Sequence, residues 1–236
     1  GRRMIRTRNA VLATAAIAAL ITGGTALAGP RNAQAQDQAF SISQNITADA
    51  VTVCNTNPVI ATYHGTVNLT IPVVTLLANF EAEMQAAATA GQSPHAAGAQ
   101  NPDITFTVSV PQGTQVGPGT VTNSSSLISN WWLSPNSEKT EMKVNLHLTQ
   151  TDWQGLYTTY TSEKSNPLGH TITVKIPYAV GANNAADAAR IAQEQITSRA
   201  TVKFFTGGDT PNKVFTSAVA SNPIASTPTD CFSNAP

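Results

Sequence analysis

The stretch TVNLTIP at residues 66–72 decides the fold class, because its apolar residues alternate strictly with polar ones. A period of two is typical of a half-buried antiparallel strand, in which successive side chains point to opposite faces. The same alternation predicts further strands at residues 104–110, 142–148 and 171–176, and weaker ones at 40–46, 201–205 and 214–218. The chain is therefore mainly β, and an all-helical fold is excluded.

The pattern of residues 66–72 occurs a second time, as TITVKIP at residues 171–177. An Asn-Pro pair precedes each copy, and a histidine, His64 or His170, stands before each. A helix and then a strand are expected after both copies. We interpret the two copies as an internal strand-helix-strand repeat with a pseudo-twofold axis. The alternative is chance similarity between two Thr- and Val-rich strands.

Two segments have helical rather than strand character. Residues 76–90 and 185–198 are rich in Ala, Glu and Gln with apolar residues at helical spacing. Asn184 is placed to cap the second helix by accepting a backbone N–H. Strands and helices together predict an antiparallel β-sandwich, immunoglobulin-like or related, with two accessory α-helices.

The first 35 residues are expected to be a secretory signal peptide that is removed. Arginines precede an apolar run at residues 10–21, and A-x-A cleavage sites follow at 26–28 and 33–35. Alternatives are a membrane anchor or amphipathic helix, and a Tat-type signal if Arg2-Arg3 is translated. Later in the chain no apolar run approaches the ~18 residues needed to span a bilayer. Residues 36–236 are thus expected to form one secreted domain without a membrane span.

Removal of the signal peptide changes the electrostatics. The whole chain has 13 basic and 13 acidic residues, and five of the basic ones lie before residue 36, which leaves 8 − 13 = −5. The remaining Lys and Arg residues are scattered singly, without a basic patch that follows phosphates. Nucleic acids and anionic membrane surfaces are therefore disfavoured as partners.

The two cysteines, Cys54 and Cys231, lie near the two ends of the expected domain. Export delivers them to an oxidising compartment, so a single disulfide between them is predicted. A metal site would need more ligands than two cysteines that are not at C-x-x-C spacing.

The four histidines accompany no catalytic or metal-binding motif. His64 and His170 are metal candidates, because the repeat would place them at equivalent positions that meet across the axis. His147 is expected on the solvated face of its strand, and His95 in a loop. Acidic pairs such as Asp152/Glu163 are interpreted as solvated surface charge. No catalytic residue and no cofactor is predicted.

Aromatic side chains give the most specific candidate site. All three tryptophans and two of the four tyrosines fall within thirty residues: Trp131, Trp132, Trp153, Tyr157 and Tyr160. Trp131-Trp132 lies in the Gly-, Pro- and Ser-rich stretch 112–137, expected to be a long surface loop or a loose strand pair. Flat amphipathic rings on a β scaffold can stack on sugars or anchor a protein partner. The alternative is that one Trp of each group is core and the tyrosines support a hairpin.

These patterns favour a secreted or cell-envelope protein without enzymatic activity, in a surface, adhesion or structural role. A first alternative is a carbohydrate-binding module that uses the aromatics near Trp131 and Trp153. A second is a subunit of a strand-exchanged surface assembly, joined through β edges such as residues 40–46. A third is a secreted hydrolase with a dispersed site. The expected partners are accordingly a glycan or cell-wall polymer, or a second copy of the chain.

Overall fold

A computed structural model describes residues 40–48, 53–96, 98–149, 152–224 and 230–232. The expected signal peptide, residues 1–35, lies outside the described residues. No helix in the described part of the chain is both long and apolar enough to cross a membrane.

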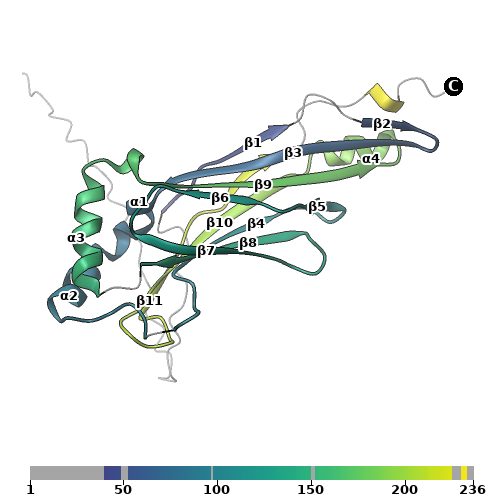
Figure 1. Cartoon of the computed structure of the whole chain (residues 1–236). Helices are drawn as coiled ribbons and strands as arrows, with labels where there is room; N and C mark the ends of the chain where they lie inside the picture. The colour runs from purple at the N-terminus through teal and green to yellow at the C-terminus, as the bar shows by residue number, and fades with distance from the viewer. Residues whose placement is uncertain (1–39, 49–52, 97, 150–151, 225–229, 233–236) are drawn as a thin grey trace, which may run out of the picture. The chain divides into compact units, whose positions relative to one another are not determined.

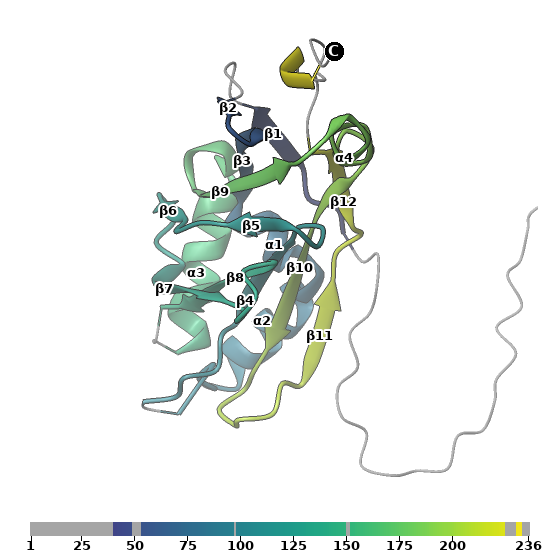
Figure 2. The ribbon, with the colours of Figure 1, turned by 90° about the vertical axis from the view of Figure 1, so that its right-hand side faces the viewer.

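Two antiparallel six-stranded sheets form the body of the molecule (Figures 1 and 2). The first contains β1 (Gln44–Ala48), β2 (Val53–Thr56), β3 (Val59–Pro72), β5 (Thr114–Val116), β6 (Thr120–Asn123) and β9 (Thr171–Ala182). The second contains β4 (Ile104–Ser109), β7 (Ile128–Pro135), β8 (Glu141–Leu148), β10 (Gln195–Phe204), β11 (Lys213–Thr216) and β12 (Ala220–Pro223). Their orders are β1-β3-β9-β5, with β2 on β3 and β6 on β9, and β11-β10-β4-β8-β7, with β12 on β10.

The hydrophobic core consists of the inward-facing residues of both sheets. Along β3 and β9 the side chains alternate between buried and partly exposed, as the period of two requires. The second sheet contributes the buried residues Phe106, Val144, Leu146 and Val202, among others. The structure confirms the predicted antiparallel β-sandwich, and the strands predicted at 66–71, 104–110, 142–148 and 171–176 are all present.

The two copies of the repeated heptad pair with one another. Thr66 is opposite Pro177 and Pro72 is opposite Thr171, so residues 66–72 and 171–177 form one antiparallel ladder. Each copy continues through helix into a strand of the second sheet, β4 or β10, and these two strands also pair antiparallel. The strand-helix-strand unit therefore occurs twice, and an approximate twofold axis relates the two paired strands in each sheet.

The helices differ in part from the prediction. The segment expected as one helix at 76–90 is α1 (Val73–Leu77), the 3₁₀ turn η1 (Ala78–Phe80) and α2 (Glu81–Thr89). The helix expected at 185–198 is α4 (Ala185–Ile191), capped as predicted by the Asn184 side chain, which accepts from the Asp187 N–H at 2.8 Å. The prediction is wrong beyond residue 191, because the helix ends there and β10 begins at Gln195 and pairs with β4.

A third long helix, α3 (Trp153–Lys164), follows β8, and a short 3₁₀ turn, η2 (Pro167–Gly169), leads from it to β9. Asp152 caps α3 by accepting a hydrogen bond from the Gly155 N–H at 2.8 Å. Trp153, Leu156, Tyr160 and Glu163 form its buried face. α3 packs against α1 and α2 at one end of the sheets, whereas α4 contacts β9 at the other (Figure 1).

Charged side chains join the helices to their neighbours. Lys164 on α3 donates to both carboxylate oxygens of Glu81 on α2 at 2.9 Å, and Lys213 on β11 donates to Glu83. These hydrogen bonds lower the pKa values of Glu81 and Glu83. The Tyr160 hydroxyl also donates to Glu81, at 3.2 Å.

The disulfide predicted from the two cysteines is present. Cys54 on β2 and Cys231 on the 3₁₀ turn η3 (Asp230–Phe232) are bonded, with Cα atoms 5.6 Å apart and a separation of 177 positions in sequence. The bridge closes nearly the whole folded domain into one loop. Among the described strands, β1 lies wholly outside this loop.

Candidate functional site

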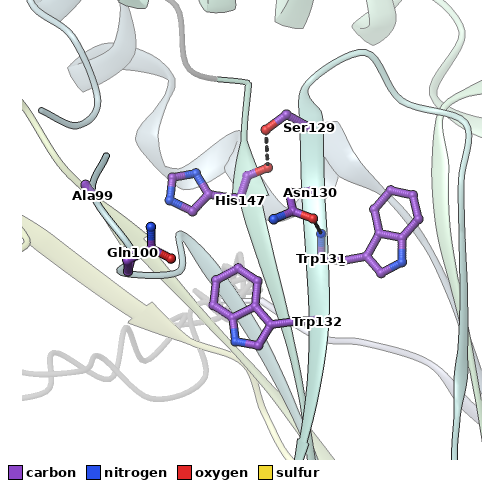
Figure 3. A pocket seen from close by; sticks show the side chains of 7 residues that line it. All are labelled: Ala99, Gln100, Ser129, Asn130, Trp131, Trp132 and His147. Atoms are coloured by element: carbon purple, nitrogen blue, oxygen red, sulfur yellow. Dashed lines mark hydrogen bonds between the residues drawn. The ribbon is translucent and has the colours of Figure 1, made fainter. Parts of the chain in front are cut away.

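A polar pocket lies on the outer face of the second sheet, beside the edge strand β7. It has a volume of about 390 Å³ and is lined by Ala99, Gln100, Ser129, Asn130, Trp131, Trp132 and His147 (Figure 3). Ala99 and Gln100 come from the α2–β4 connection, residues 90–96 and 98–103, which passes over the end of β8. The other residues lie on β7 and β8, so that a rigid sheet holds one wall of the pocket and a connection holds the other.

The residues 112–137, expected as a loop or a loose strand pair, contain β5, β6 and β7. Trp131 and Trp132 are therefore consecutive residues of an extended strand, and their rings point to opposite sides of β7 (Figure 3). Trp132 is opposite Asn145 and shares the outer face with His147, whose ring centroid is 6.3 Å away. Trp131 is opposite the core residue Leu146 and is 37% exposed at the sheet edge. The two rings do not form a common flat platform.

Two amide side chains in the pocket have free hydrogen-bonding capacity. Asn130 Oδ1 accepts from the Trp131 N–H at 2.9 Å, and Gln100 Nε2 donates to the Gly98 carbonyl oxygen at 3.1 Å. The Asn130 amide nitrogen and the Gln100 side-chain oxygen make no hydrogen bond to a described residue. A ligand beside the Trp132 ring would thus find a donor and an acceptor.

The other aromatic candidates lie in α3, and the hairpin considered for the tyrosines is not formed. Trp153 and Tyr160 are 2% and 0% exposed, so the expectation that they are free to stack on a ligand is wrong. The Trp153 indole donates to the Phe205 carbonyl oxygen at 2.8 Å. Tyr157 is partly buried against the hydrophobic core, with its ring 6.2 Å from that of Tyr160. These three residues attach the helix to the sandwich and are not part of the pocket.

The two histidines expected to meet across the repeat axis are far apart. His64 pairs with Ala179 on β9, whereas His170 precedes β9 and accepts the Val73 N–H through its carbonyl oxygen. Nine residues of strand separate these positions, which corresponds to about 30 Å at ~3.3 Å per residue. The antiparallel pairing puts the two histidines at opposite ends of the ladder, so they cannot share a metal ion.

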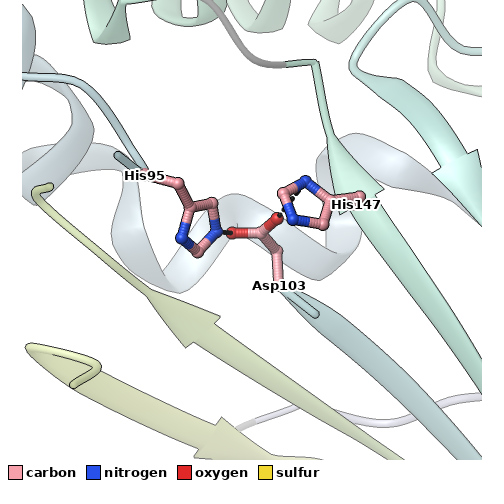
Figure 4. A group of neighbouring side chains, drawn as sticks. All are labelled: His95, Asp103 and His147. Atoms are coloured by element: carbon pink, nitrogen blue, oxygen red, sulfur yellow. Dashed lines mark hydrogen bonds and ion pairs between the residues drawn. The ribbon is translucent and has the colours of Figure 1, made fainter. Parts of the chain in front are cut away.

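A different histidine pair is buried together with a carboxylate. His95, Asp103 and His147 come from the α2–β4 connection, the residue before β4 and the end of β8, and Asp103 lies between the two rings (Figure 4). His95 Nε2 is 2.7 Å from Asp103 Oδ1, and His147 Nδ1 is 3.5 Å from Asp103 Oδ2. The Leu148 N–H donates to Oδ2 at 2.9 Å. The residues are 8%, 1% and 4% exposed, so all three side chains are buried.

The expectation that His147 lies on a solvated face is therefore wrong. Its strand alternates as predicted, but the α2–β4 connection and Phe205 cover the outer face at this end, with the His95 and Phe205 ring centroids 4.4 Å apart. Asp103 was not singled out from the sequence. Two features of the sequence pointed to it: Asp103 immediately precedes one predicted strand, and another predicted strand carries His147.

Glu163 is a second acid that burial distinguishes from the surface charges. It is 3% exposed and accepts hydrogen bonds from the Ser125 hydroxyl and the Ser126 N–H, both at 2.7 Å. Glu163 thereby fixes the turn before β7 against α3. The interpretation of Asp152/Glu163 as solvated surface charge is wrong for Glu163, and the two residues lie at opposite ends of the helix.

Comparison with known proteins gives no family. No protein-family model matches the chain, and no curated protein matches it in sequence. A solved structure from a study of "pH-induced modulation of Streptococcus parasanguinis adhesion by Fap1 fimbriae" aligns with 81% of this chain and 98% of that chain. The identity is 9% and the TM-score 0.29, which is too low to support an argument about fold or function.

Proposed function

We propose that this chain is a secreted or cell-envelope protein without enzymatic activity, and that it binds an uncharged glycan in the pocket beside Trp132. The observation that carries the proposal is the combination of a partly exposed indole with two amide side chains in one pocket of about 390 Å³. Apolar ring faces stack on the C–H faces of sugars, and amides bond their hydroxyl groups.

The lining of the pocket supports an uncharged ligand. No Asp, Glu, Lys or Arg is among its seven lining residues, and His147 is the single titratable one. An anionic glycan would need a cation to offset its desolvation. Hydrolysis of a glycosidic bond normally requires two carboxyl groups about 5 to 9.5 Å apart. Carboxylates are missing from the described lining, which favours binding over hydrolysis.

The disulfide supports an extracytoplasmic location. Disulfides such as Cys54–Cys231 persist in oxidising compartments and are rare in the cytosol. A surface, adhesion or structural role then follows from glycan binding outside the cell. Self-association through β edges, the other partner expected from the sequence, stays a prediction. In that alternative β1 is the edge strand concerned, and its Gln44 side chain donates to the Ile196 carbonyl oxygen and to Asn222 on the second sheet.

The test is a pull-down of the full chain on a panel of insoluble uncharged polysaccharides, followed by titration with the soluble form of the polysaccharide that binds. We expect Trp132→Ala to weaken binding about 10-fold or more, because the stacking ring is lost. The matched control is Tyr157→Ala, which removes an aromatic ring outside the pocket and should bind as the unmodified chain does. Equal affinity of Trp132→Ala and the unmodified chain, or no binding to any polysaccharide, would refute the proposal.

A further inference from the structure

The cluster of His95, Asp103 and His147 leaves one nitrogen of each imidazole without a partner. His95 Nδ1 and His147 Nε2 are fully buried, and neither makes a hydrogen bond within the described part of the chain. Leaving a buried polar atom unsatisfied is costly, so native proteins seldom retain two in one place. The opposite nitrogens, His95 Nε2 and His147 Nδ1, face the Asp103 carboxylate, and with one of its oxygens they form the set of atoms that a cation between the three side chains would bind.

We propose that His95, Asp103 and His147 bind a divalent transition-metal ion, with Zn²⁺ as the best fit. Two imidazoles and one carboxylate form a ligand set that Zn²⁺ prefers, completed by a water molecule or a ligand atom at the fourth position. One ligand atom from each residue lies within 4.8 Å of the others. Zinc ligands about 2.0 to 2.2 Å from the ion are roughly 3.4 Å apart in a tetrahedron. His147 Nδ1 is 3.5 Å from Asp103 Oδ2, close to this spacing, whereas His95 Nε2 is 2.7 Å from Asp103 Oδ1 and would have to move slightly apart on binding.

The surroundings of the cluster suit a metal ion in two further respects. The Leu148 N–H donates to Asp103 Oδ2 and so orients the carboxylate, as a second-shell donor orients a ligating carboxylate. His147 also lines the polar pocket, which gives the ion and its water an entry path. With neutral histidines the cluster carries one negative charge, so a divalent cation offsets the charge buried with Asp103.

A bound ion would join two parts of the chain that are distant in sequence. His95 belongs to the α2–β4 connection and His147 to β8, and the ion would fasten the connection onto the sheet beside the pocket. Binding to the folded state alone raises the unfolding temperature. At a concentration 100-fold above Kd the increase would be about 5 to 10 °C for a chain of this size. This inference is separate from glycan binding, because its readouts need no polysaccharide.

The experiment uses a double variant, His64→Gln/His170→Gln, in which only His95 and His147 remain as histidines. The full chain is freed of metal with a chelator, titrated with Zn²⁺, and followed by ¹⁵N NMR of histidine ring nitrogens and by elemental analysis after dialysis. We expect about one zinc ion per chain, as in the unmodified chain, with shifts of ring nitrogens of both remaining histidines. His95→Gln and His147→Gln should each lower zinc affinity at least 10-fold.

Several outcomes would overturn the proposal. One is absence of zinc from the dialysed chain at micromolar free Zn²⁺, which would leave the cluster as a hydrogen-bond network only. Another is retained zinc without ring shifts in the double variant. A third is loss of zinc from His64→Gln/His170→Gln but not from His147→Gln. Because the double variant changes two partly exposed residues, its result does not depend on whether the buried-site variants fold.

Discussion

At the residue scale, Asp103 combines three interactions in a buried position. It accepts from the Leu148 N–H, bonds His95 and faces His147, and it is 1% exposed. We expect Asp103→Ala to lower the free energy of unfolding by about 3 to 5 kcal/mol, since its partners remain buried without it. Urea denaturation of the metal-free chain measures the change. Asp209→Ala, at an exposed acid, is the control and should change stability by less than about 0.5 kcal/mol.

Periodicity in the sequence shows why this cluster escaped prediction. Alternation placed His147 on the face of β8 opposite Leu146 and Leu148, and that assignment is correct. What alternation cannot show is whether another segment covers that face. Burial of His147 depends on the α2–β4 connection and on Phe205, which pack there from distant parts of the sequence. Trp132, in contrast, was found because an aromatic cluster is visible in the composition alone.

Tyr160 gives a prediction for alkaline pH. Burial, together with the negative charge of Glu81, raises the pKa of Tyr160 to about 12. Between pH 10 and 12 the unfolded chain releases this proton while the folded chain keeps it, so stability must fall as pH rises. The loss reaches about 2 kcal/mol at pH 12. Tyr160→Phe should show a smaller decrease over this range in urea denaturation, and an unchanged pH profile in the variant would contradict the assignment.

At the scale of elements, the β3–β9 ladder depends on a glycine under an aromatic ring. Gly65 is opposite Tyr178, and a Cβ at residue 65 would lie 2.4 Å from the Tyr178 Oη. The ring cannot move away easily because its hydroxyl donates to the buried Ile224 carbonyl oxygen. We expect Gly65→Ala to lower the free energy of unfolding by about 1 to 3 kcal/mol in urea denaturation.

Gly181 on β9 provides the matched control for Gly65. A Cβ at Gly181 would have its nearest neighbour, Ile60 Cγ2, at 3.7 Å, which is an ordinary van der Waals contact. Gly181→Ala should therefore be neutral or slightly stabilising, by up to about 1 kcal/mol, because alanine restricts the unfolded chain. Equal losses in the two variants would indicate a general intolerance of the ladder to alanine rather than a clash with Tyr178.

Helices were harder to predict than strands, because packing and strand pairing override the local helix propensity of two segments. The sequence WQGLYTTYTSEK of α3 contains glycine, tyrosines and threonines, which are poor helix formers. The helix is nevertheless formed because Trp153, Leu156 and Tyr160, at helical spacing, are buried against α1, α2 and the core. For α4 the sequence predicted too much helix. Residues 193–195 are good helix formers but do not continue the helix, because pairing of β10 with β4 stabilises the extended conformation more.

At the scale of the whole molecule, the disulfide should dominate stability. Closing a loop of 177 residues removes chain entropy from the unfolded state worth up to about 5 kcal/mol. Cys54→Ser/Cys231→Ser should lower the unfolding temperature markedly in calorimetry, and dithiothreitol should do the same to the unmodified chain. Alkylation of the intact denatured protein is expected to label neither cysteine. Equal unfolding temperatures with and without the bridge would contradict the prediction.

The architecture as a whole was predictable to the level of fold class and internal repeat. Residues 66–72 and 171–177 were identified as equivalent, but their direct pairing was not, because sequence similarity does not specify which strands are neighbours. The pairing puts His64 and His170 at opposite ends of the ladder, which removed the metal site expected from symmetry. The two repeat units are therefore related by symmetry in their strands. The pocket and the His95, Asp103 and His147 cluster lie in the first unit's surroundings only, where the two units differ.

The position of the bridge also determines how the protein would carry mechanical load. A pull on the two chain ends passes from the segment before Cys54 through the S–S bond to the segment after Cys231, and bypasses the residues between them. Of the described strands, only β1 lies wholly in the path of the force and would be peeled from β3. About 600 Å of potential extension stays locked inside the loop. On a surface exposed to shear, the second sheet, the pocket and the rest of the first sheet would keep their form under a tension that detaches β1.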